Sequence, residues 1–273
     1  MISLGSWAAW LVAVVIGVLT VPMLWVAQHI ASEDGWVSFT AGFVEDEQLR
    51  DGVVKAAAGA MLARVILPPQ TARLLDQSLE DLVRTAVEQP GFVEAWRESL
   101  RRTHRLTFGP DANSDRLVAD IGPLATFIAR DVSQQLPVRL VVPDRVVVPI
   151  NKQPDPRLIE RVAASPSRSM AGLIATGIAL LVSMLLAGGV PGALLRFGLA
   201  FVAVSAVMFT ATGVGLPRLL ERAPAPTAFA RQMRELLVAH ASSSFDAWAL
   251  TLGVIGAVAT IGGVAGGALR RRA

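Results

Sequence analysis

The chain has 273 residues, of which 53% are hydrophobic and 17% are charged, and its formal net charge at pH 7 is +3. This apolar content places the chain on the membrane-protein side of globular averages. Cysteine and tyrosine are both absent, which excludes disulfides, thiolate metal sites, covalent c-type haem and catalysis by either side chain.

Four apolar segments are long enough to cross a hydrocarbon core of ~30 Å. The first, residues 4–27, has no ionisable side chain. It also lacks the basic start of a signal peptide, so we interpret it as a retained span. The predicted organisation is a transmembrane helix in residues 1–29, an outer domain in 30–168, transmembrane helices in 169–187 and 194–217, an outer interfacial connection in 218–247, and a fourth transmembrane helix with a basic cytoplasmic tail in 248–273.

The arginines that flank the spans predict the orientation. Arg270, Arg271 and Arg272 close the chain, and Arg196 is expected in the turn between the second and third spans. By the positive-inside rule these groups mark the cytoplasm, although the 217–247 connection also carries a net positive charge. The prediction is a multi-pass plasma-membrane protein with both termini cytoplasmic and the large loop extracytoplasmic.

The outer domain is nearly neutral. Residues 30–168 hold 17 basic and 19 acidic side chains, so the basic isoelectric point comes from arginines near the spans and no nucleic-acid partner is expected. Hydrophobic periodicity predicts helices at 46–67 and 72–87, and a third helix after Pro90-Gly91. A strand at 116–120, a helix from 122 to 133, a hairpin or two short strands at 138–142 and 145–150, and a helix at 156–164 follow. Residues 227–240 are predicted to form an amphipathic interfacial helix. The predicted fold class is membrane α-helical, with four transmembrane helices plus one mainly helical α+β extracytoplasmic domain.

The densest charged feature lies on the third outer helix and consists of Arg97, Arg101, Arg102, His104 and Arg105. Guanidinium groups suit phosphate and carboxylate partners, so these residues are candidate contacts for anionic lipids or for a partner surface. The alternative is a solvated helix face that Glu94 and Glu98 balance at helical spacing.

Other polar residues give no recognisable catalytic or metal site. The three histidines, His29, His104 and His240, are isolated in the sequence, so neither a metal nor a bound cofactor is expected. The acidic cluster at 45–47 fits the first turn of a helix. Asp120 and Asp131 could form a carboxylate pair, but a cap at Asp120 is the favoured interpretation. The serines at 242–244 are expected to cap the fourth span.

The spans carry polar side chains only sparsely, which disfavours a pump or an ion channel. Their clearest feature is a set of small-residue faces, in which Gly262 is spaced from Gly266, and Gly263 from Gly267, as in a G-x-x-x-G motif. Such faces let helices approach closely. Both packing within the chain and packing on a partner would explain them.

Several short segments carry a resemblance to known proteins. They are Trp36-Val-Ser-Phe39, residues 51–57 (DGVVKAA), residues 90–104 (PGFVEAWRESLRRTH) and residues 117–124 (LVADIGPL). With the one-plus-three arrangement of spans, the chain resembles poorly characterised actinobacterial four-span membrane proteins. Its size and plan are also similar to cofactor-free accessory subunits of actinobacterial respiratory complexes. The resemblance implies no catalytic residues.

These observations favour a non-enzymatic accessory or structural subunit of a larger membrane complex. The best candidate is the actinobacterial cytochrome bc–cytochrome oxidase supercomplex, with other integral membrane subunits as partners. The alternative is a protein that binds or handles lipids or envelope glycolipids, using the face between Arg97 and Arg105. A signalling adaptor and a membrane enzyme are less favoured, because the chain offers little cytoplasmic sequence and no catalytic constellation.

Overall fold

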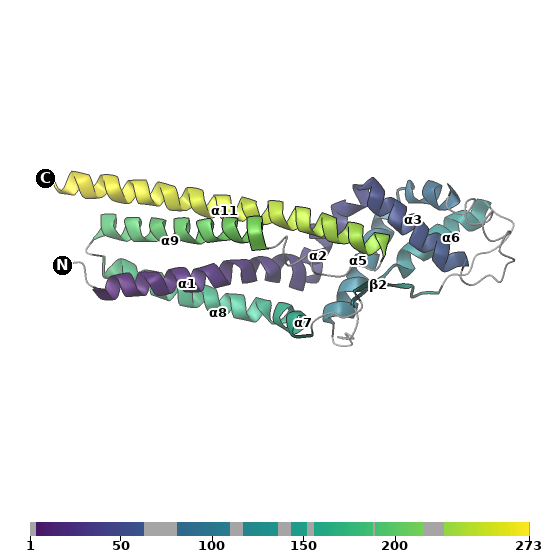
Figure 1. Cartoon of the computed structure of the whole chain (residues 1–273), viewed down its shortest axis with the longest axis horizontal. Helices are drawn as coiled ribbons and strands as arrows, with labels where there is room; N and C mark the ends of the chain where they lie inside the picture. The colour runs from purple at the N-terminus through teal and green to yellow at the C-terminus, as the bar shows by residue number, and fades with distance from the viewer. Residues whose placement is uncertain are drawn as a thin grey trace. The chain divides into compact units, whose positions relative to one another are not determined.

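The computed structural model describes residues 4–62, 81–109, 117–135, 143–151, 156–187, 189–215 and 227–272. The chain divides into two compact units, which we treat separately. Unit 1 comprises Met1–Gln28, Val162–Arg222 and Val238–Ala273, and unit 2 comprises His29–Arg161 and Ala223–Leu237. Figure 1 labels the elements of both.

Unit 1 is built from the helices α1 (Leu4–Val26), α8 (Ser165–Leu185), α9 (Val190–Thr210) and most of α11 (Ala228–Arg270). A π-helical turn, η1 (Ala27–Ala31), follows α1, and a second, η3 (Ala211–Gly215), follows α9. Four helices are long and apolar enough to cross a membrane. The prediction of four helices with the length and apolarity of membrane spans is therefore confirmed.

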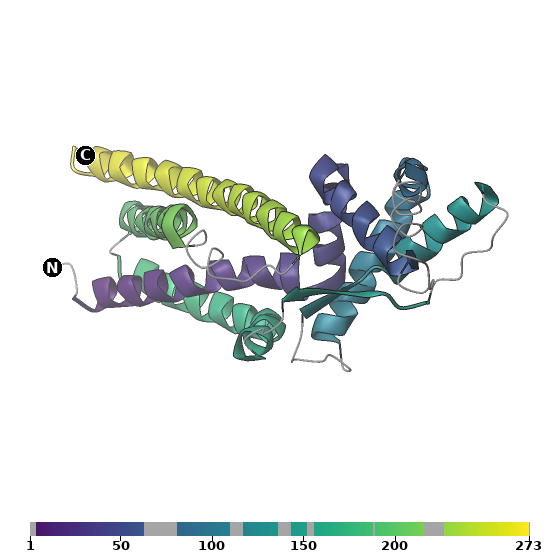
Figure 2. The same cartoon turned by 45° about the vertical axis from the view of Figure 1, so that its right-hand side comes forward.

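Within unit 1, α9 lies between α11 and the pair formed by α1 and α8, as two views of the bundle show (Figures 1 and 2). Small residues allow these contacts. A Cβ atom on Gly17 of α1 would lie 3.3 Å from Val204 on α9, and one on Gly256 of α11 would lie 2.8 Å from Val202 N on α9. Van der Waals packing of this kind holds helices together in lipid, where the hydrophobic effect cannot.

The third span begins earlier than the sequence predicted. α9 starts at Val190, directly after Gly189, whose φ of 133° lies in a region that side chains disfavour. Pro191 in the first helical turn suits a helix start, because its missing N–H is not needed there. Arg196 therefore lies in the second turn of the span, and its expected position in the interhelical turn is wrong.

The fourth span also differs from the prediction. Residues 228–247 and the apolar segment after them form one continuous 43-residue helix, so the expected boundary at 247–248 is absent and Ser242–Ser244 cap nothing. Neither glycine nor proline interrupts residues 227–252, and Ser243 Oγ donates 3.0 Å to the carbonyl of His240 within the helix. A serine can be accommodated in a helix in this way.

Unit 2 contains the helices α2 (Glu33–Thr40), α3 (Glu47–Leu62), α5 (Phe92–Phe108) and α6 (Gly122–Gln135), the 3₁₀ turn η2 (Ala41–Glu45), and most of α7 (Pro156–Ala163). The predicted helices beginning at residues 46, 92, 122 and 156 are confirmed over their described parts. Of the one predicted at 72–87, residues 81–87 are helical and the rest lies outside the described residues. The helix at 33–40 was not predicted from the sequence.

Two strands pair in unit 2. β1 (Leu117–Asp120) runs antiparallel to β2 (Val147–Asn151), with Asp120 opposite Val147. The strand at 116–120 is thus confirmed over residues 117–120, and the run predicted at 145–150 forms a strand from Val147. Its described partner is β1, across the intervening helix α6. Residues 138–142 lie outside the described residues.

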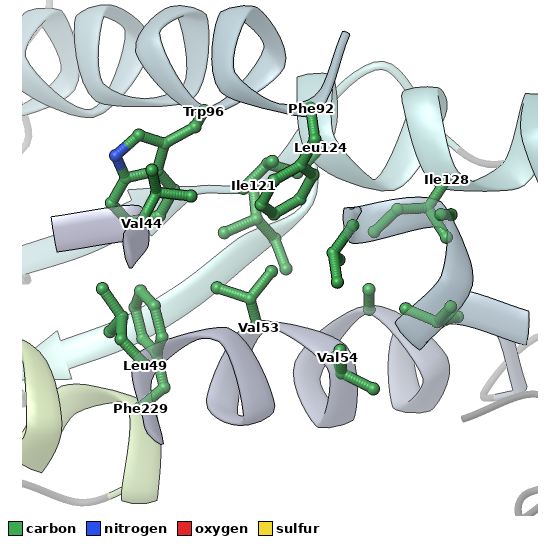
Figure 3. Packing of buried hydrophobic residues seen from close by; sticks show 14 of the residues in the cluster. Val44, Leu49, Val53, Val54, Phe92, Trp96, Ile121, Leu124, Ile128 and Phe229 are labelled. Atoms are coloured by element: carbon green, nitrogen blue, oxygen red, sulfur yellow. The ribbon is translucent and has the colours of Figure 1, made fainter. Parts of the chain in front are cut away.

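One hydrophobic core fills unit 2 (Figure 3). Apolar side chains from α3, α5 and α6 meet in it, and Phe229 and Met233 from the first turns of α11 belong to the same cluster. The apolar face predicted to lie at the membrane interface in residues 227–240 therefore packs into a protein core instead. The sequence could not separate these two cases, because burying the same apolar stripe is favourable in a protein core and at a bilayer interface.

Candidate functional site

Among the described residues of unit 1, the most buried charged side chain belongs to Arg196, which is only 6% exposed. It lies six residues into α9, or about 9 Å along the helix axis from Val190. An arginine inside a span is costly to bury, so its surroundings must compensate the charge. We call these surroundings the Arg196 cluster: Ser6, Trp7, Trp10, Ser183 and Arg196.

The Arg196 cluster ties three helices together. Arg196 Nη1 donates 2.9 Å to the carbonyl oxygen of Ser183 on α8, and Trp10 Nε1 on α1 donates 2.9 Å to the carbonyl of Arg196. Ser6 and Ser183 exchange hydroxyl-to-carbonyl hydrogen bonds of 3.1 and 3.2 Å. The guanidinium carbon also lies 5.4 Å from the ring centroid of Trp7, a cation–π distance.

The carbonyl of Ser183 explains why a cation suits this place. Ser183 is in the last turn of α8, and the N–H of Ala187, four residues on, donates to Met184 instead. The Ser183 carbonyl thus lacks its usual helical partner at the negative end of a helix dipole. Arg196 and Ser6 supply the missing donors.

The arginine face of α5 is a lattice of ion pairs. Glu98 pairs with Arg101, Arg102 and Arg105 at 3.1 to 3.5 Å, as the short spacings along one helix allow. Arg97 and Arg101 also reach Glu94, at 3.6 and 3.3 Å. Hydrogen bonds to Glu94 and Glu98 raise the pKa of Arg101, which stays charged at any working pH.

Two further contacts connect this face to neighbouring segments of unit 2. Arg105 pairs with Glu33 of α2 at 3.8 Å, and Arg102 donates 3.0 Å to the carbonyl of Asp144. The alternative that the sequence left open, a solvated face balanced by carboxylates, therefore describes the geometry of these four arginines well.

His104 differs from the arginines around it because it is buried. Its side chain is 7% exposed, and Nε2 lies 3.1 Å from the carbonyl oxygen of Ile30. Its ring packs 5.0 Å from that of Phe108. Burial lowers the pKa of His104 from its usual range, while the Ile30 carbonyl and the Glu33 carboxylate partly oppose this shift. A neutral imidazole that bonds two segments is a structural element, and it does not join the arginines in presenting charge.

Two carboxylates considered as site residues act as caps. Asp120 is 2% exposed, and its Oδ1 accepts hydrogen bonds from the N–H groups of Gly122 at 2.9 Å and Val146 at 3.2 Å. Asp46 Oδ1 accepts from Leu49 N at 2.8 Å, at the start of α3. The bonds from Gly122 and Leu49 satisfy backbone donors that helix starts leave unpaired, and the bond from Val146 ties the residue before β2 to Asp120. The predicted cap at Asp120 is confirmed.

The glycines of the fourth span face different surroundings. A Cβ atom on Gly263 would lie 2.6 Å from Leu195 N of α9. Cβ atoms on Gly266 and Gly267 would lie 3.4 Å and 4.0 Å from the Pro191 ring. Gly262 has no neighbouring atom within 4 Å. Three of the four predicted packing glycines therefore lie against α9 of the same chain, and Gly262 points away from it.

No group of three or more histidine, cysteine, aspartate or glutamate side chains within metal-binding reach occurs among the described residues. His29 packs at 5.4 Å from Phe39 in unit 2, and His240 lies on α11. Comparison with known proteins adds nothing to this picture: no family model, no curated protein and no solved structure matches the chain.

The Arg196 cluster is the feature that the sequence reading missed. Its members come from three helices, and those on α1 are more than 170 residues away in sequence from Ser183 and Arg196, so no local spacing connects them. One signal was available: Arg196 is followed by an uninterrupted apolar run, and a span that starts at Pro191 would include it.

Proposed function

We propose that this chain is a non-catalytic accessory subunit of a larger plasma-membrane assembly, bound to other integral membrane subunits. One observation supports the proposal most directly. In the most apolar window of α11 only 11% of the residues are buried within the chain, against 33% in α9. The fourth span thus contacts the bundle along a narrow stripe and offers most of its surface to other molecules.

The open surface of α11 is aliphatic and contains a hollow at backbone level. Its exposed members are Leu250, Val254, Ile255, Val258, Ile261, Val264 and Leu269. Gly262 lies among them with no neighbour within 4 Å. An exposed glycine on a face with β-branched residues lets a second helix approach closely, which lipid chains do not require. We therefore assign this surface to a partner helix.

The topology of the proposal follows from charge. Arg270, Arg271 and Arg272 end the fourth span, and Arg196 lies near the start of the third, so we place this end of the bundle and both termini in the cytoplasm. Unit 2 is then the extracytoplasmic α+β domain. Because the chain has no native cysteine, single cysteines at Glu88 and Arg272 test the arrangement with a membrane-impermeant maleimide. We expect labelling of intact cells at Glu88 only.

The most concrete partner is the actinobacterial cytochrome bc–cytochrome oxidase supercomplex, on the basis of similar size and plan. In that setting the chain holds or covers an outer surface, and electron transfer belongs to the subunits that own the cofactors. The lipid-handling alternative is less supported, because it relies on the arginines of α5, and Glu33, Glu94 and Glu98 already pair with them.

The decisive experiment is purification through an affinity tag on this chain in mild detergent. We expect co-purifying integral membrane subunits, with haem absorbance if the partner is respiratory. Recovery as a lone monomer would overturn the proposal. Gly262→Leu fills the hollow on α11 and should reduce partner recovery, whereas Ser243→Ala, an exposed change on the same helix, should leave it intact.

A further inference from the structure

We infer that the Arg196 cluster is one half of a binding site for an anionic phospholipid, in which Arg196 holds the phosphate group. The cluster lies in unit 1 at the end of the bundle that carries the start of α1, the connection between α8 and α9, and the end of α11 (Figure 1). This inference is independent of the accessory role proposed above. It concerns a buried arginine whose hydrogen bonds within the protein use only part of its donors.

The Arg196 guanidinium has hydrogen-bond donors that no described residue uses. A guanidinium carries five N–H groups in a planar fork, and Arg196 uses Nη1 on the Ser183 carbonyl. Nε and Nη2 form no hydrogen bond with any described residue. They are also not completely buried, unlike the unpaired side-chain atoms of Trp36, Ser99 and Thr176. Two adjacent donors that an outside group can reach match the oxygens of a phosphate, which arginine binds as a fork.

No carboxylate among the described residues pairs with this cation. Arg196 forms no ion pair with a described residue, and Asp246 is the only acidic side chain in the described part of unit 1. Asp246 lies on α11, about 36 Å along the helix axis from Arg270. A charge near a span end with no counter-ion among the described residues of its own unit favours one from outside.

Other arginines give this end of the bundle a uniformly positive character. Arg270, Arg271 and Arg272 end α11, and the Arg270 guanidinium lies beside Gly189, since a Cβ atom there would be 2.7 Å from Arg270 Nη1. Anionic lipids concentrate at such surfaces. This charge raises the local concentration of the ligand, while the buried Arg196 supplies the geometry that fixes it.

The neighbouring surface favours a lipid over a soluble anion. Leu185, two residues from Ser183, is 76% exposed, and Val190 at the start of α9 is 72% exposed. The Trp7 ring covers one face of the guanidinium, and tryptophan prefers the headgroup level of a bilayer. A molecule with a phosphate at Arg196 and acyl chains on these aliphatic side chains satisfies both requirements, whereas inorganic phosphate satisfies only the first.

Native mass spectrometry of the full-length protein, released from nanodiscs that contain phosphatidylcholine and phosphatidylglycerol, tests the inference. We expect one phosphatidylglycerol to be retained in preference to phosphatidylcholine. Arg196→Gln keeps a donor for the Ser183 carbonyl but removes the charge, and it should lower this preference about tenfold, as expected for one charge-assisted contact. Arg196→Lys should retain part of it, because the charge remains and the fork is lost.

Arg272→Gln is the matched control, since it removes the same charge from the exposed tail. It should leave the tightly retained lipid in place. Equal losses from Arg196→Gln and Arg272→Gln would overturn the inference in favour of a general basic surface. Displacement of the lipid by millimolar inorganic phosphate would overturn the lipid assignment. If Arg196→Gln does not fold, Trp7→Leu decides, because it removes the headgroup-level tryptophan beside the guanidinium without altering the charge, and it must weaken retention.

Discussion

Gly198 and Gly256 face each other across the contact between the third and fourth spans, with no side chain between their backbones. A Cβ atom on Gly256 would lie 2.8 Å from the carbonyl oxygen of Gly198, closer than real Cβ contacts allow. Backbone approach of this kind gives α9 and α11 close van der Waals contact, which holds helices together in lipid.

Replacing Gly256 with alanine should therefore loosen the bundle. The added methyl group must push α11 away from α9, and overpacking in a tight contact costs about 1–3 kcal/mol. Gly262→Ala is the matched control, because its methyl group meets nothing within 4 Å. Unfolding in a graded detergent mixture, followed by circular dichroism, should show loss of stability for Gly256→Ala only. Equal stability of the two variants would contradict the α9–α11 contact.

The Asp120 cap should be essential to unit 2. Asp120→Ala leaves the N–H groups of Gly122 and Val146 without their acceptor in a buried place. Loss of a cap costs about 0.5–2 kcal/mol, and the Val146 donor left without its acceptor adds to this cost. Asp120→Asn keeps one acceptor oxygen and should be milder. A thermal melt that ranks the two variants in the opposite order would show that the carboxylate is not a cap.

Unit 2 should lose stability in mild acid because of His104. Its pKa in the folded protein lies below the usual value of about 6.5. The unfolded chain then binds the proton more readily, so stability is complete above the unfolded pKa and falls as the pH drops toward the folded one. Hydrogen exchange of α5 should accelerate below about pH 6.5. His104→Gln should flatten this response, while His240→Gln, at an exposed position, should not.

The arginine face of α5 should prove dispensable for lipid binding. In Arg101→Glu/Arg102→Glu two cations paired with Glu94 and Glu98 are replaced by repelling carboxylates. We expect the phosphatidylglycerol retained by the purified protein to remain unchanged, with modestly lower stability. Loss of lipid in this variant, but not in Arg196→Gln, would revive the lipid-handling alternative and place its site on unit 2.

The continuity of α11 is testable with one proline. Ser243 is exposed and lies in the middle of the helix, where proline removes a hydrogen bond and clashes with the preceding turn at a cost of about 3 kcal/mol. Ser243→Pro should be strongly destabilising, and Ser243→Ala should be neutral. A tolerated proline would support the break that the sequence suggested between an interfacial helix and the fourth span.

The sequence determined the parts of this protein that depend on local composition. Apolar length alone identified four spans, and helical spacing alone paired Glu94 and Glu98 with the arginines of α5. Tertiary structure decided whatever needed two distant segments. Only packing shows that residues 229–233 enter a protein core instead of a bilayer interface, because the same apolar stripe serves either environment. Only packing shows that Arg196 and Ser6 both meet Ser183, because polar contacts across three helices produce no regular spacing in the sequence.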